Sequence, residues 1–351
     1  MSTSKIKDIL ARVYNAPRPA VADLEFLLSL SAGPETKALY AFADQVRKKF
    51  AGNGILLRGI IEFDNNCRNT CLYCGLNRKN KAITRYRLSQ SQVLDSVARM
   101  AAQGIKTVIL QSGETSDLDA QWLAVLIREI KQRYHLAVTL SVGEQDLKVY
   151  RLWRTAGADR YLLKIETTDR KLYRLLHPEM DYDHRVNCLS NLRKLGYQVG
   201  SGIIIGLRGQ SKRSIAKDIL FFKQYEFDMI GLGPFIPHYQ TKLARDKKGT
   251  ALLTLNALAV TRIVTRYSHL PATTALGSLE KDYRIIGLQA GANVLMPNFT
   301  PQPYRRYYEL YPGKRCVNEA VGACVPCLSR LAGSISRHLD YSYGHTLRKS
   351  A

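Results

Sequence analysis

Residues 55–74 read ILLRGIIEFDNNCRNTCLYC, and this stretch decides the fold. Its first nine residues are almost continuously apolar, as expected for a strand that is buried on both faces of a parallel sheet. Cys67, Cys71 and Cys74 then follow within eight residues. The chain therefore passes from a buried strand directly into a cysteine-rich loop, at the strand end where parallel barrels gather their functional groups.

Seven more short apolar runs follow, and amphipathic stretches such as SQSQVLDSVARMAAQG separate them. The predicted strands cover residues 55–63, 107–114, 136–144, 160–167, 198–207, 229–237, 271–277 and 293–298. Ser91 and Ser214 are the predicted N-terminal caps of two intervening helices. Eight strands that alternate with helices predict an α/β fold, a TIM-type (β/α)8 barrel. The seventh run, PATTALG, fits this pattern least well because it is short and poor in β-branched aliphatic residues.

The sequence contains no low-complexity segment and no Pro/Gly/Ser-rich linker that would divide it. Residues 1–50 carry helical patterns, for example DLEFLLSLSAG, and predict an N-terminal helical extension. We expect the barrel, together with a C-terminal cysteine motif, over residues 51–330. Residues 331–351 are predicted to form a basic C-terminal tail.

The net charge is +23, from 52 lysines and arginines against 29 aspartates and glutamates. A field of this sign attracts anions, such as nucleic acid, an acidic protein or a small anionic substrate. The basic residues are spread along the chain, and no aromatic-rich recognition motif accompanies them. Nucleic acid is therefore not the expected partner.

The N-terminal residues, MSTSKIKDILARVYNAPRP, lack the apolar run and cleavage site of a secretory signal. No run of 18 apolar residues indicates a membrane span, so no membrane partner is expected. Seven cysteines, an odd number with three in one cluster, suit reduced thiols that hold a metal. These features together predict a cytoplasmic protein.

The spacing C-x3-C-x2-C places three thiolates on one short loop. Each thiolate can bind one iron of a cubane cluster, which leaves the fourth iron open to chelation by the amine and carboxylate of an amino acid. A tetrahedral zinc ion would lack one ligand. The sequence therefore predicts a 4Fe–4S cluster at Cys67, Cys71 and Cys74.

Several stretches of the chain resemble sequences of a known enzyme family. They are IIEFDNNCRNTCLYCGLNRKN, VILQSGE, VTLSVGE, GADRYLLKIET, GLGPFIPH, PATTALG, ANVLMPNFTPQPYR and YPGKRCVNEAVGACVPC. With the cysteine triplet, they resemble the radical S-adenosylmethionine (SAM) enzymes. Within that superfamily the chain is similar to the HydE-type maturases of FeFe hydrogenase over about residues 50–330.

The resemblance implies that the 4Fe–4S cluster reductively cleaves SAM. The positions that match SAM-binding residues of the family are Tyr73, Ser112, Gly113, Glu114, Ser141, Glu166 and Arg185. On this resemblance, Tyr73 packs near the adenine, Glu114 accepts hydrogen bonds from the methionine ammonium and Arg185 binds the methionine carboxylate. The positions that match the substrate cavity are Thr139, Thr273, Thr274, Met296, Tyr308 and Tyr311.

A second triplet, Cys316, Cys324 and Cys327, follows the last predicted strand. In related maturases this spacing can carry an auxiliary iron–sulfur cluster, while an empty or zinc-loaded site stays open as an alternative. Cys188 lies in a helical pattern and is predicted to be a buried core thiol.

The resemblance further implies a 5′-deoxyadenosyl radical that acts on a small sulfur- or amino-acid-bearing substrate. In HydE-type enzymes this is an anionic, organometallic compound used in assembly of the hydrogenase di-iron cofactor. The expected partners are this substrate, an electron donor such as ferredoxin or flavodoxin, and the other hydrogenase maturases.

Alternative functions come from related and from unrelated classes. A methylornithine synthase shares the barrel and the first triplet, and a biotin-synthase-like enzyme would need cysteines on the second and third strands, where this chain has none. A non-catalytic iron–sulfur protein would hold the cluster without cleaving SAM. A basic RNA-binding protein would show salt-sensitive binding to nucleic acid.

Overall fold

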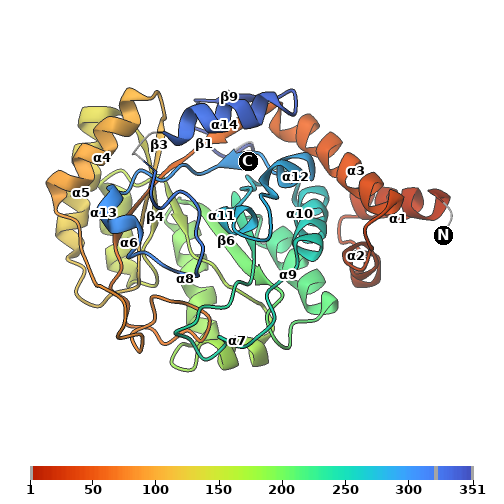
Figure 1. The fold of residues 1–351 in the computed structure, drawn as a ribbon, viewed down its shortest axis with the longest axis horizontal. Coiled ribbons are helices and arrows are strands. Elements are labelled where there is room, and N and C mark those ends of the chain that lie inside the picture. Colours follow the sequence, from red (N-terminus) through yellow and green to blue (C-terminus); the bar gives the residue numbers. More distant parts are fainter. Residues whose placement is uncertain (1–2, 320–322, 349–351) are drawn as a thin grey trace.

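The computed structural model describes residues 3–319 and 323–348, and its strands form a ring of parallel pairs with helices outside (Figure 1). The strands are β1 (Gly54–Leu57), β2 (Gly59–Asp64), β3 (Thr107–Ser112), β4 (Ala137–Ser141), β5 (Arg160–Leu162), β6 (Gln198–Ile205), β7 (Met229–Pro234), β8 (Val294–Leu295) and β9 (His338–Asp340). The helices of the N-terminal half are α1 (Thr3–Asn15), α2 (Val21–Leu28), α3 (Pro34–Ala51), α4 (Gln90–Ala102), α5 (Ala120–Tyr134), α6 (Leu147–Thr155), α7 (Arg170–Leu176) and α8 (Tyr182–Lys194). Those of the C-terminal half are α9 (Lys212–Gln224), α10 (Ala251–Thr265), α11 (Thr274–Gly277), α12 (Arg284–Gln289), α13 (Gln302–Arg305) and α14 (Cys324–Gly333).

The ring closes through short connections between two sheets. β2 to β7 form a parallel sheet in sequence order, and β8 and β9 flank β1 in a second parallel sheet. β1 runs into β2 across Arg58, so these two strands together occupy the first position of the barrel. Residues 269–271 supply the seventh position, with bridges from His269 to Met229 and from Pro271 to Val294. The predicted TIM-type barrel is therefore confirmed.

The predicted seventh strand, residues 271–277, is wrong over most of its length. Its second half is the short helix α11, and only isolated bridges remain near residues 269–271. The sequence accounts for this difference, because Ala275 and Leu276 are strong helix formers and no run of β-branched aliphatic residues opposes them.

The two predicted helix caps are each displaced by two or three residues. Ser89, rather than Ser91, caps α4 and forms a capping box with Gln92. Ser211 caps α9, and Ser214 occupies the third position of that capping box. The cap of each helix is a serine, as predicted. The earlier serine accepts the capping hydrogen bond because its backbone is still extended.

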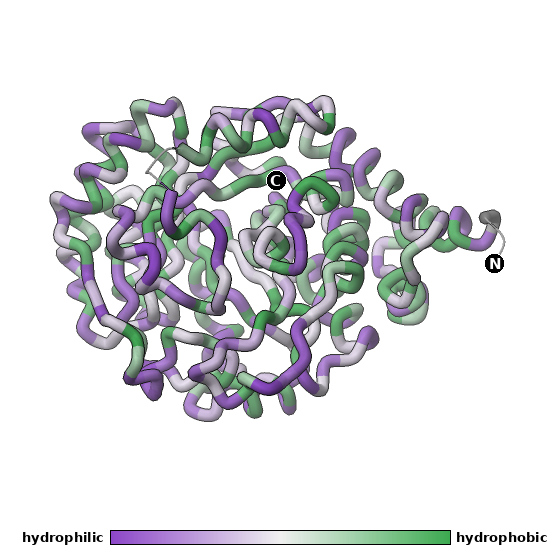
Figure 2. The backbone as a smooth tube through the Cα atoms, viewed as in Figure 1, coloured by the Kyte–Doolittle hydropathy of each residue, from purple (hydrophilic) through white to green (hydrophobic). Residues whose placement is uncertain are grey.

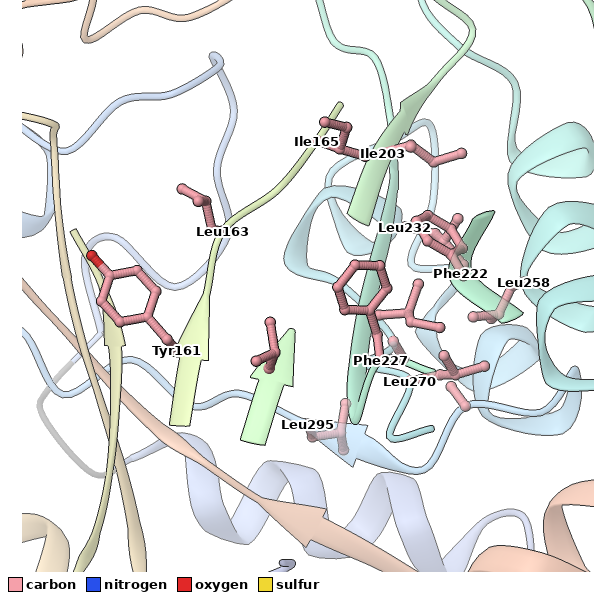
Figure 3. Close-up of a cluster of buried hydrophobic side chains, with 14 of the residues drawn as sticks. Tyr161, Leu163, Ile165, Ile203, Phe222, Phe227, Leu232, Leu258, Leu270 and Leu295 are labelled. Atoms are coloured by element: carbon pink, nitrogen blue, oxygen red, sulfur yellow. The ribbon is translucent and has the colours of Figure 1, made fainter. Parts of the chain in front are cut away.

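Large apolar side chains fill the space between the sheet and the outer helices (Figure 3). Ile203 of β6 and Leu232 of β7 belong to the same buried cluster as Phe222 of α9 and Leu258 of α10. Burial of one such side chain contributes about 1.5 to 3 kcal/mol. These contacts hold the strands in register and so fix the strand ends on which the polar groups lie.

The N-terminal helices pack on the outside of the barrel and project to one side of it (Figure 1). α2 contacts α9, and α3 contacts α10. α10 also contacts α9 and is therefore covered on both sides, which agrees with its hydrophobic sequence over much of its length (Figure 2). No helix among the described residues is both long enough and apolar enough to cross a membrane.

The described part of the predicted basic tail, residues 331–348, folds against the barrel, while residues 349–351 lie outside the described chain. β9 pairs with β1, and the segment after β9 then crosses the end of the barrel at which the strands begin (Figure 1). Three successive carbonyl oxygens of this segment accept hydrogen bonds from buried basic side chains. The pairs are Tyr343 O with Arg160 Nη2 (2.7 Å), Gly344 O with Arg58 Nη2 (3.1 Å) and His345 O with His269 Nε2 (2.9 Å).

The tight course of this closing segment generates a stability prediction at Gly344. Its φ of 56° is left-handed, and an added Cβ would lie 2.8 Å from Leu56 Cδ1. Gly313 has a similar φ of 70°, but no atom lies within 4 Å of the position of its added Cβ. Gly313→Ala therefore costs about 1 kcal/mol for the backbone conformation alone. Gly344→Ala is expected to cost a further 1 to 3 kcal/mol or so from overlap.

Urea unfolding of the two alanine variants beside the parent protein measures this difference. Equal losses in the two variants would show that the segment around Gly344 is not held against β1 as described.

Candidate active site

The cysteine loop, residues 65–80, leaves the carboxyl end of β2 and forms neither helix nor strand. Arg85 lies against it and donates hydrogen bonds to four of its carbonyl oxygens. The acceptors are Asn65 O (2.6 Å), Leu76 O (2.9 Å), Asn77 O (2.9 Å) and Asn80 O (3.3 Å). Because a guanidinium presents its donors in a rigid plane, these bonds fix the shape of the loop that carries the three cysteines.

The end of β3 packs tightly on the same loop at Gly113. The Gly113 amide donates to Asp64 O at 2.9 Å, and a Cβ at Gly113 would overlap Asn66 O and approach Cys67 Cβ. Only glycine fits this contact, which explains why glycine stands between Ser112 and Glu114.

Glu114 joins the cysteine loop to the ends of β3 and β4. Its side chain is 6% exposed, and its Oε1 accepts a hydrogen bond from Arg68 Nη2 at 3.1 Å. Its Oε2 accepts from the Glu144 amide at 2.8 Å. The carboxylate is thus fixed at the mouth of the barrel, beside the loop of Cys67.

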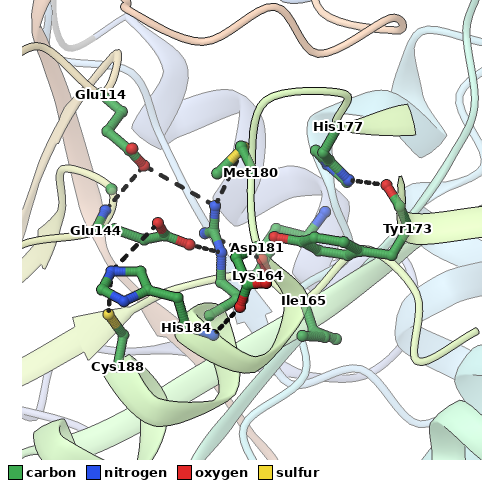
Figure 4. Close-up of polar contacts among 12 residues, drawn as sticks. Glu114, Glu144, Lys164, Ile165, Tyr173, His177, Met180, Asp181, His184 and Cys188 are labelled. Atoms are coloured by element: carbon green, nitrogen blue, oxygen red, sulfur yellow. Dashed lines mark hydrogen bonds and ion pairs between the residues drawn. The ribbon is translucent and has the colours of Figure 1, made fainter. Parts of the chain in front are cut away.

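Glu144 is a site residue that the sequence prediction missed. It follows β4 as Glu114 follows β3, and Figure 4 shows the two carboxylates close together with His184 beyond Glu144. Its Oε1 lies 2.6 Å from Arg185 Nε, an ion pair without hydrogen-bond alignment, and Arg185 Nη2 lies 3.9 Å from Glu114 Oε2. The repeated ending in SGE and VGE on neighbouring strands was the signal that could have found it.

Burial and charge act against each other in this group. Burial raises the pKa of Glu144, and the guanidinium of Arg185 opposes that shift. For Arg185, burial lowers the pKa, but Glu144, Tyr173 and Glu114 outweigh it, so that the pKa is raised. Arg185 therefore stays cationic in a buried position, next to two carboxylates, and can bind a further carboxylate.

Glu166 occupies the end of the fourth barrel strand in a strained conformation. Its φ is 62°, which is left-handed and unusual for glutamate. Lys164 Nζ lies 2.9 Å from Glu166 Oε2, again without hydrogen-bond alignment. Strained residues of this kind gather at functional sites, where the surrounding structure maintains them.

Tyr73 is held by His177, the residue that directly follows α7. The Tyr73 hydroxyl lies 2.9 Å from His177 Nε2, and His177 Nδ1 lies 3.0 Å from Tyr173 O. A neutral imidazole that donates through Nδ1 and accepts through Nε2 satisfies both contacts. Burial, together with Arg185, lowers the pKa of His177 to about 3.

The predicted substrate residues are distributed around the barrel, and the structure connects some of them. The Tyr308 hydroxyl accepts a hydrogen bond from Gln111 Nε2 of β3 at 3.2 Å, and Thr273 Oγ1 donates to Leu232 O of β7 at 3.2 Å. The Thr139 hydroxyl on β4 is buried and has no hydrogen-bond partner among the described residues. Thr274 begins α11, Met296 directly follows β8, and Tyr311 is partly buried.

A buried ion pair that the sequence prediction missed connects this side to the C-terminal segment. Glu62 of β2 pairs with Lys314 and accepts a hydrogen bond from Asn298 Nδ2 at 3.0 Å. Lys314 Nζ also lies 5.1 Å from the centre of the Tyr308 ring. Lys314 therefore places a cation inside the barrel mouth, on the segment YPGKRC.

Comparison with known proteins decides the family. The Radical SAM superfamily matches residues 61–222. Over 322 residues the chain is 45% identical to the FeFe hydrogenase maturase subunit HydE of Thermotoga maritima, covering 92% of each chain. This chain is a HydE-like radical SAM enzyme. The prediction that it resembles HydE-type maturases is confirmed.

This HydE-like enzyme also has relatives that are methylornithine synthases. It is 30% identical over 275 residues to the 3-methylornithine synthase of Methanosarcina acetivorans, covering 78% of this chain and 77% of that one. The crystal structure of methylornithine synthase (PylB) matches the fold with a TM-score of 0.81 at 25% identity, covering 95% of this chain and 97% of that one.

Family membership implies a 4Fe–4S cluster and SAM in this HydE-like enzyme, and the cysteine loop fits the cluster. Cys67, Cys71 and Cys74 are free thiols. Burial, reinforced by the other two thiols, raises the pKa of Cys71, and burial with Cys67 raises that of Cys74 to about 12. These three thiols would lose their protons to solvent when iron binds, and the positive charge of iron would relieve the repulsion between the thiolates.

The second cysteine triplet of the HydE-like enzyme is only partly assembled. Cys316 Sγ, a Glu319 carboxylate oxygen and Cys324 Sγ all lie within 4.8 Å of one another, whereas Cys327 is exposed and outside this group. The hydrogen bond with Cys324, together with burial, raises the pKa of Cys316. Arg305 Nη1 donates to the carbonyl oxygens of Cys316 (3.1 Å) and Glu319 (2.9 Å). Two thiols and one carboxylate thus converge, in place of the three thiols expected from the sequence.

The buried neutral His177 predicts a specific acid sensitivity. Its pKa is about 3 in the folded protein and about 6.5 when unfolded, so the unfolded chain binds the proton more readily between these values. Stability is therefore fully present above pH 6.5 or so, and falls by up to about 4 kcal/mol as the pH drops toward 3.

Urea unfolding between pH 7 and pH 4 should show a shallower loss in His177→Gln than in the parent protein. His338→Gln, which changes an exposed histidine of β9, is the matched control and should follow the parent. If all three proteins lose stability at the same rate, His177 is not held neutral as described.

Proposed function

We propose that this enzyme acts in assembly of the di-iron cofactor of an FeFe hydrogenase, on a small anionic or organometallic substrate that carries sulfur or an amino acid. The observation that carries the proposal is the 45% identity to the Thermotoga maritima maturase over 92% of both chains. A likeness of this extent includes both the barrel and the C-terminal segment that holds Lys314. We place the activity in the cytoplasm, where thiols stay reduced.

We assign Cys67, Cys71 and Cys74 as the ligands of the 4Fe–4S cluster. When bound, the cluster supplies one electron that cleaves a carbon–sulfur bond of SAM and yields methionine and a 5′-deoxyadenosyl radical. We assign the contacts with SAM to Tyr73, Ser112, Gly113, Glu114, Ser141, Glu166 and Arg185. The electron would come from a carrier protein such as a ferredoxin or flavodoxin. The product would pass to other hydrogenase maturases.

The side chains at the mouth of the barrel supply orientation. Glu114 offers a fixed acceptor to an ammonium group, and Arg185 offers a buried cation to a carboxylate. Glu144 pairs with Arg185 at 2.6 Å, so that the guanidinium need not reorganise when an amino acid binds. Glu166 presents a carboxylate that suits the hydroxyls of a ribose.

We assign the substrate side to Thr139, Thr273, Thr274, Met296, Tyr308 and Tyr311. The Thr139 hydroxyl is buried without a partner among the described residues and can donate to an anion. Lys314 adds positive charge beside Tyr308, and Glu62 keeps it in place. A closed, largely buried site of this kind keeps water from the reacting atoms.

A methylornithine synthase is the second candidate, favoured by the TM-score of 0.81 to that crystal structure. The close approach of Cys316, Glu319 and Cys324 favours the maturase instead. The C-terminal cysteine motif is part of the resemblance to the maturases. A biotin-synthase-like function is not supported, because β3 and β4 carry no cysteine.

Cys71→Ala is predicted to abolish SAM cleavage because it removes one of the three cluster ligands. Anaerobically reconstituted protein would be given SAM and dithionite, and 5′-deoxyadenosine and methionine would be measured by chromatography. Cys188→Ala is the matched control, because Cys188 is a buried thiol of α8, as predicted, and should leave both products unchanged. Candidate substrates would then be ranked by how far they accelerate cleavage.

Two outcomes would contradict the proposal in different ways. An intact cluster without SAM cleavage would favour a non-catalytic iron–sulfur protein. SAM cleavage that methylornithine precursors accelerate, and sulfur-bearing amino acids do not, would favour the second candidate.

We also propose that Cys316, Cys324 and Cys327 belong to an auxiliary iron–sulfur site, with Glu319 beside them. Cys324→Ala is predicted to lower the iron bound per chain to that of one cubane, while Cys188→Ala keeps the parent value. Because Cys324 is not one of the three assigned ligands of the first cluster, SAM cleavage should persist in Cys324→Ala. Iron analysis and electron paramagnetic resonance of the reduced proteins test this, and identical iron contents in parent and Cys324→Ala would exclude the auxiliary cluster.

A further inference from the structure

The chain makes a rare three-residue turn at Glu166, shortly after β5. The Thr167 amide donates a hydrogen bond to Ile165 O at 2.8 Å, and the φ of Glu166 is 62°. A γ-turn with a positive φ at its central residue is strained. On the side of the sheet, β6 holds the turn, because the Glu166 amide donates to Gly202 O at 2.9 Å. Residues 167–169 have left the sheet, so a different contact must hold them.

Asp218 supplies that contact from α9, one of the helices outside the barrel (Figure 1). Its Oδ1 accepts hydrogen bonds from the Thr168 amide at 2.7 Å and from the Thr168 hydroxyl at 2.5 Å. Asp169, the next residue, caps α7 by accepting hydrogen bonds from two of its amides. The chain is therefore fixed at two successive residues directly after the turn of Glu166.

Asp218 is an unfavourable residue for so buried a position. Its side chain is 0% exposed, and its Oδ2 has no hydrogen-bond partner among the described residues. Burial raises the pKa of Asp218 to about 7, and the hydrogen bonds from Thr168 oppose this shift only in part. A buried polar atom without a partner lowers the free energy of unfolding. The contact with Thr168 thus explains an aspartate at a position where an apolar residue would stabilise the fold better.

We propose that Asp218 is a positioning residue for SAM binding, which acts through Thr168 to keep Glu166 in its strained turn. This inference rests on the proposed function, in which the Glu166 carboxylate binds the ribose hydroxyls of SAM. If Thr168 is released, the turn can relax to an unstrained φ, and the carboxylate then leaves its place 2.9 Å from Lys164 Nζ. Asp218 compensates the strain, so that the carboxylate is already oriented before SAM binds.

Asp218→Ala and Asp218→Asn distinguish this role from a purely structural one. Asparagine keeps an oxygen that can accept both hydrogen bonds from Thr168, whereas alanine keeps none. SAM binding to the anaerobically reconstituted proteins would be measured by calorimetry. We expect a Kd about tenfold or more above the parent value in Asp218→Ala, and within about threefold of it in Asp218→Asn.

Ile219→Val is the matched control on the same helix. Ile219 is buried next to Asp218 in the sequence, and its side chain belongs to the hydrophobic core. Its Kd for SAM should stay within about twofold of the parent value. Thr168→Val is a second test variant, in case Asp218→Ala does not fold. It removes one of the two hydrogen bonds at a partly exposed position and should also raise the Kd.

Hydrogen exchange of the protein without SAM is a second measurement, and it does not depend on SAM chemistry. Backbone amides of residues 165–169 should exchange about tenfold faster or more in Asp218→Ala than in the parent protein, because the turn opens more often. Asp218→Asn and Ile219→Val should keep the parent rate over these residues.

The assignment of Glu166 and the role of Asp218 can fail separately. If Glu166→Ala binds SAM as tightly as the parent, the proposed contact of Glu166 with SAM is wrong, and the role of Asp218 in SAM binding fails with it. If Glu166→Ala weakens binding while Asp218→Ala and Thr168→Val bind SAM like the parent, Asp218 is not a positioning residue. Equal weakening in Asp218→Ala and Ile219→Val would also overturn the inference, because any loss of core packing would then suffice.

Discussion

The hydrogen bonds of Arg85 to four carbonyl oxygens of the cysteine loop are the constraint on which the rest of the site depends. The loop has no regular secondary structure, so its backbone oxygens would otherwise need hydrogen-bond donors from water. One guanidinium donates to four of them and so fixes the backbone that carries the three cysteines. Burial lowers the pKa of Arg85, but the thiols and Asp64 favour its charged form. The cation that shapes the loop therefore also compensates the thiolates that iron binding requires.

Parallel pairing of β3 with β4 brings polar residues that are distant in sequence close together. Gln111 of β3 lies opposite Ser141 of β4, so Glu114 and Glu144 leave the sheet at the same height. Their carboxylates converge on Arg185, which comes from α8 and completes the group. Both carboxylates oppose the effect of burial on the pKa of this guanidinium, and Tyr173 acts in the same direction. The sheet register thus determines the electrostatics of the mouth of the barrel.

The sequence predicted most of the fold because its signals are local. Continuous apolar runs and helical spacing identified the strands, and the cysteine spacing identified the loop. PATTALG was misread because its length and position matched a strand while Ala275 and Leu276 favoured a helix. Glu144 and Lys314 escaped prediction because their roles depend on pairs, with Arg185 and with Glu62, that only the closed barrel brings together. Local patterns carry no information on such partners.

Basic residues at the two ends of the barrel lie in different surroundings. At the end where the strands begin, Arg58 and Arg160 are buried, and each donates a hydrogen bond to a carbonyl oxygen of residues 343 and 344. Burial lowers the pKa of both arginines, which shows that neutral acceptors compensate them less fully than carboxylates would. At the opposite end, Arg68 and Arg78 beside the cysteine loop stay exposed and pair with Glu114 and Glu179. A net charge of +23 therefore does not describe one uniform field, because part of it is buried among carbonyl oxygens and part is exposed and paired with carboxylates.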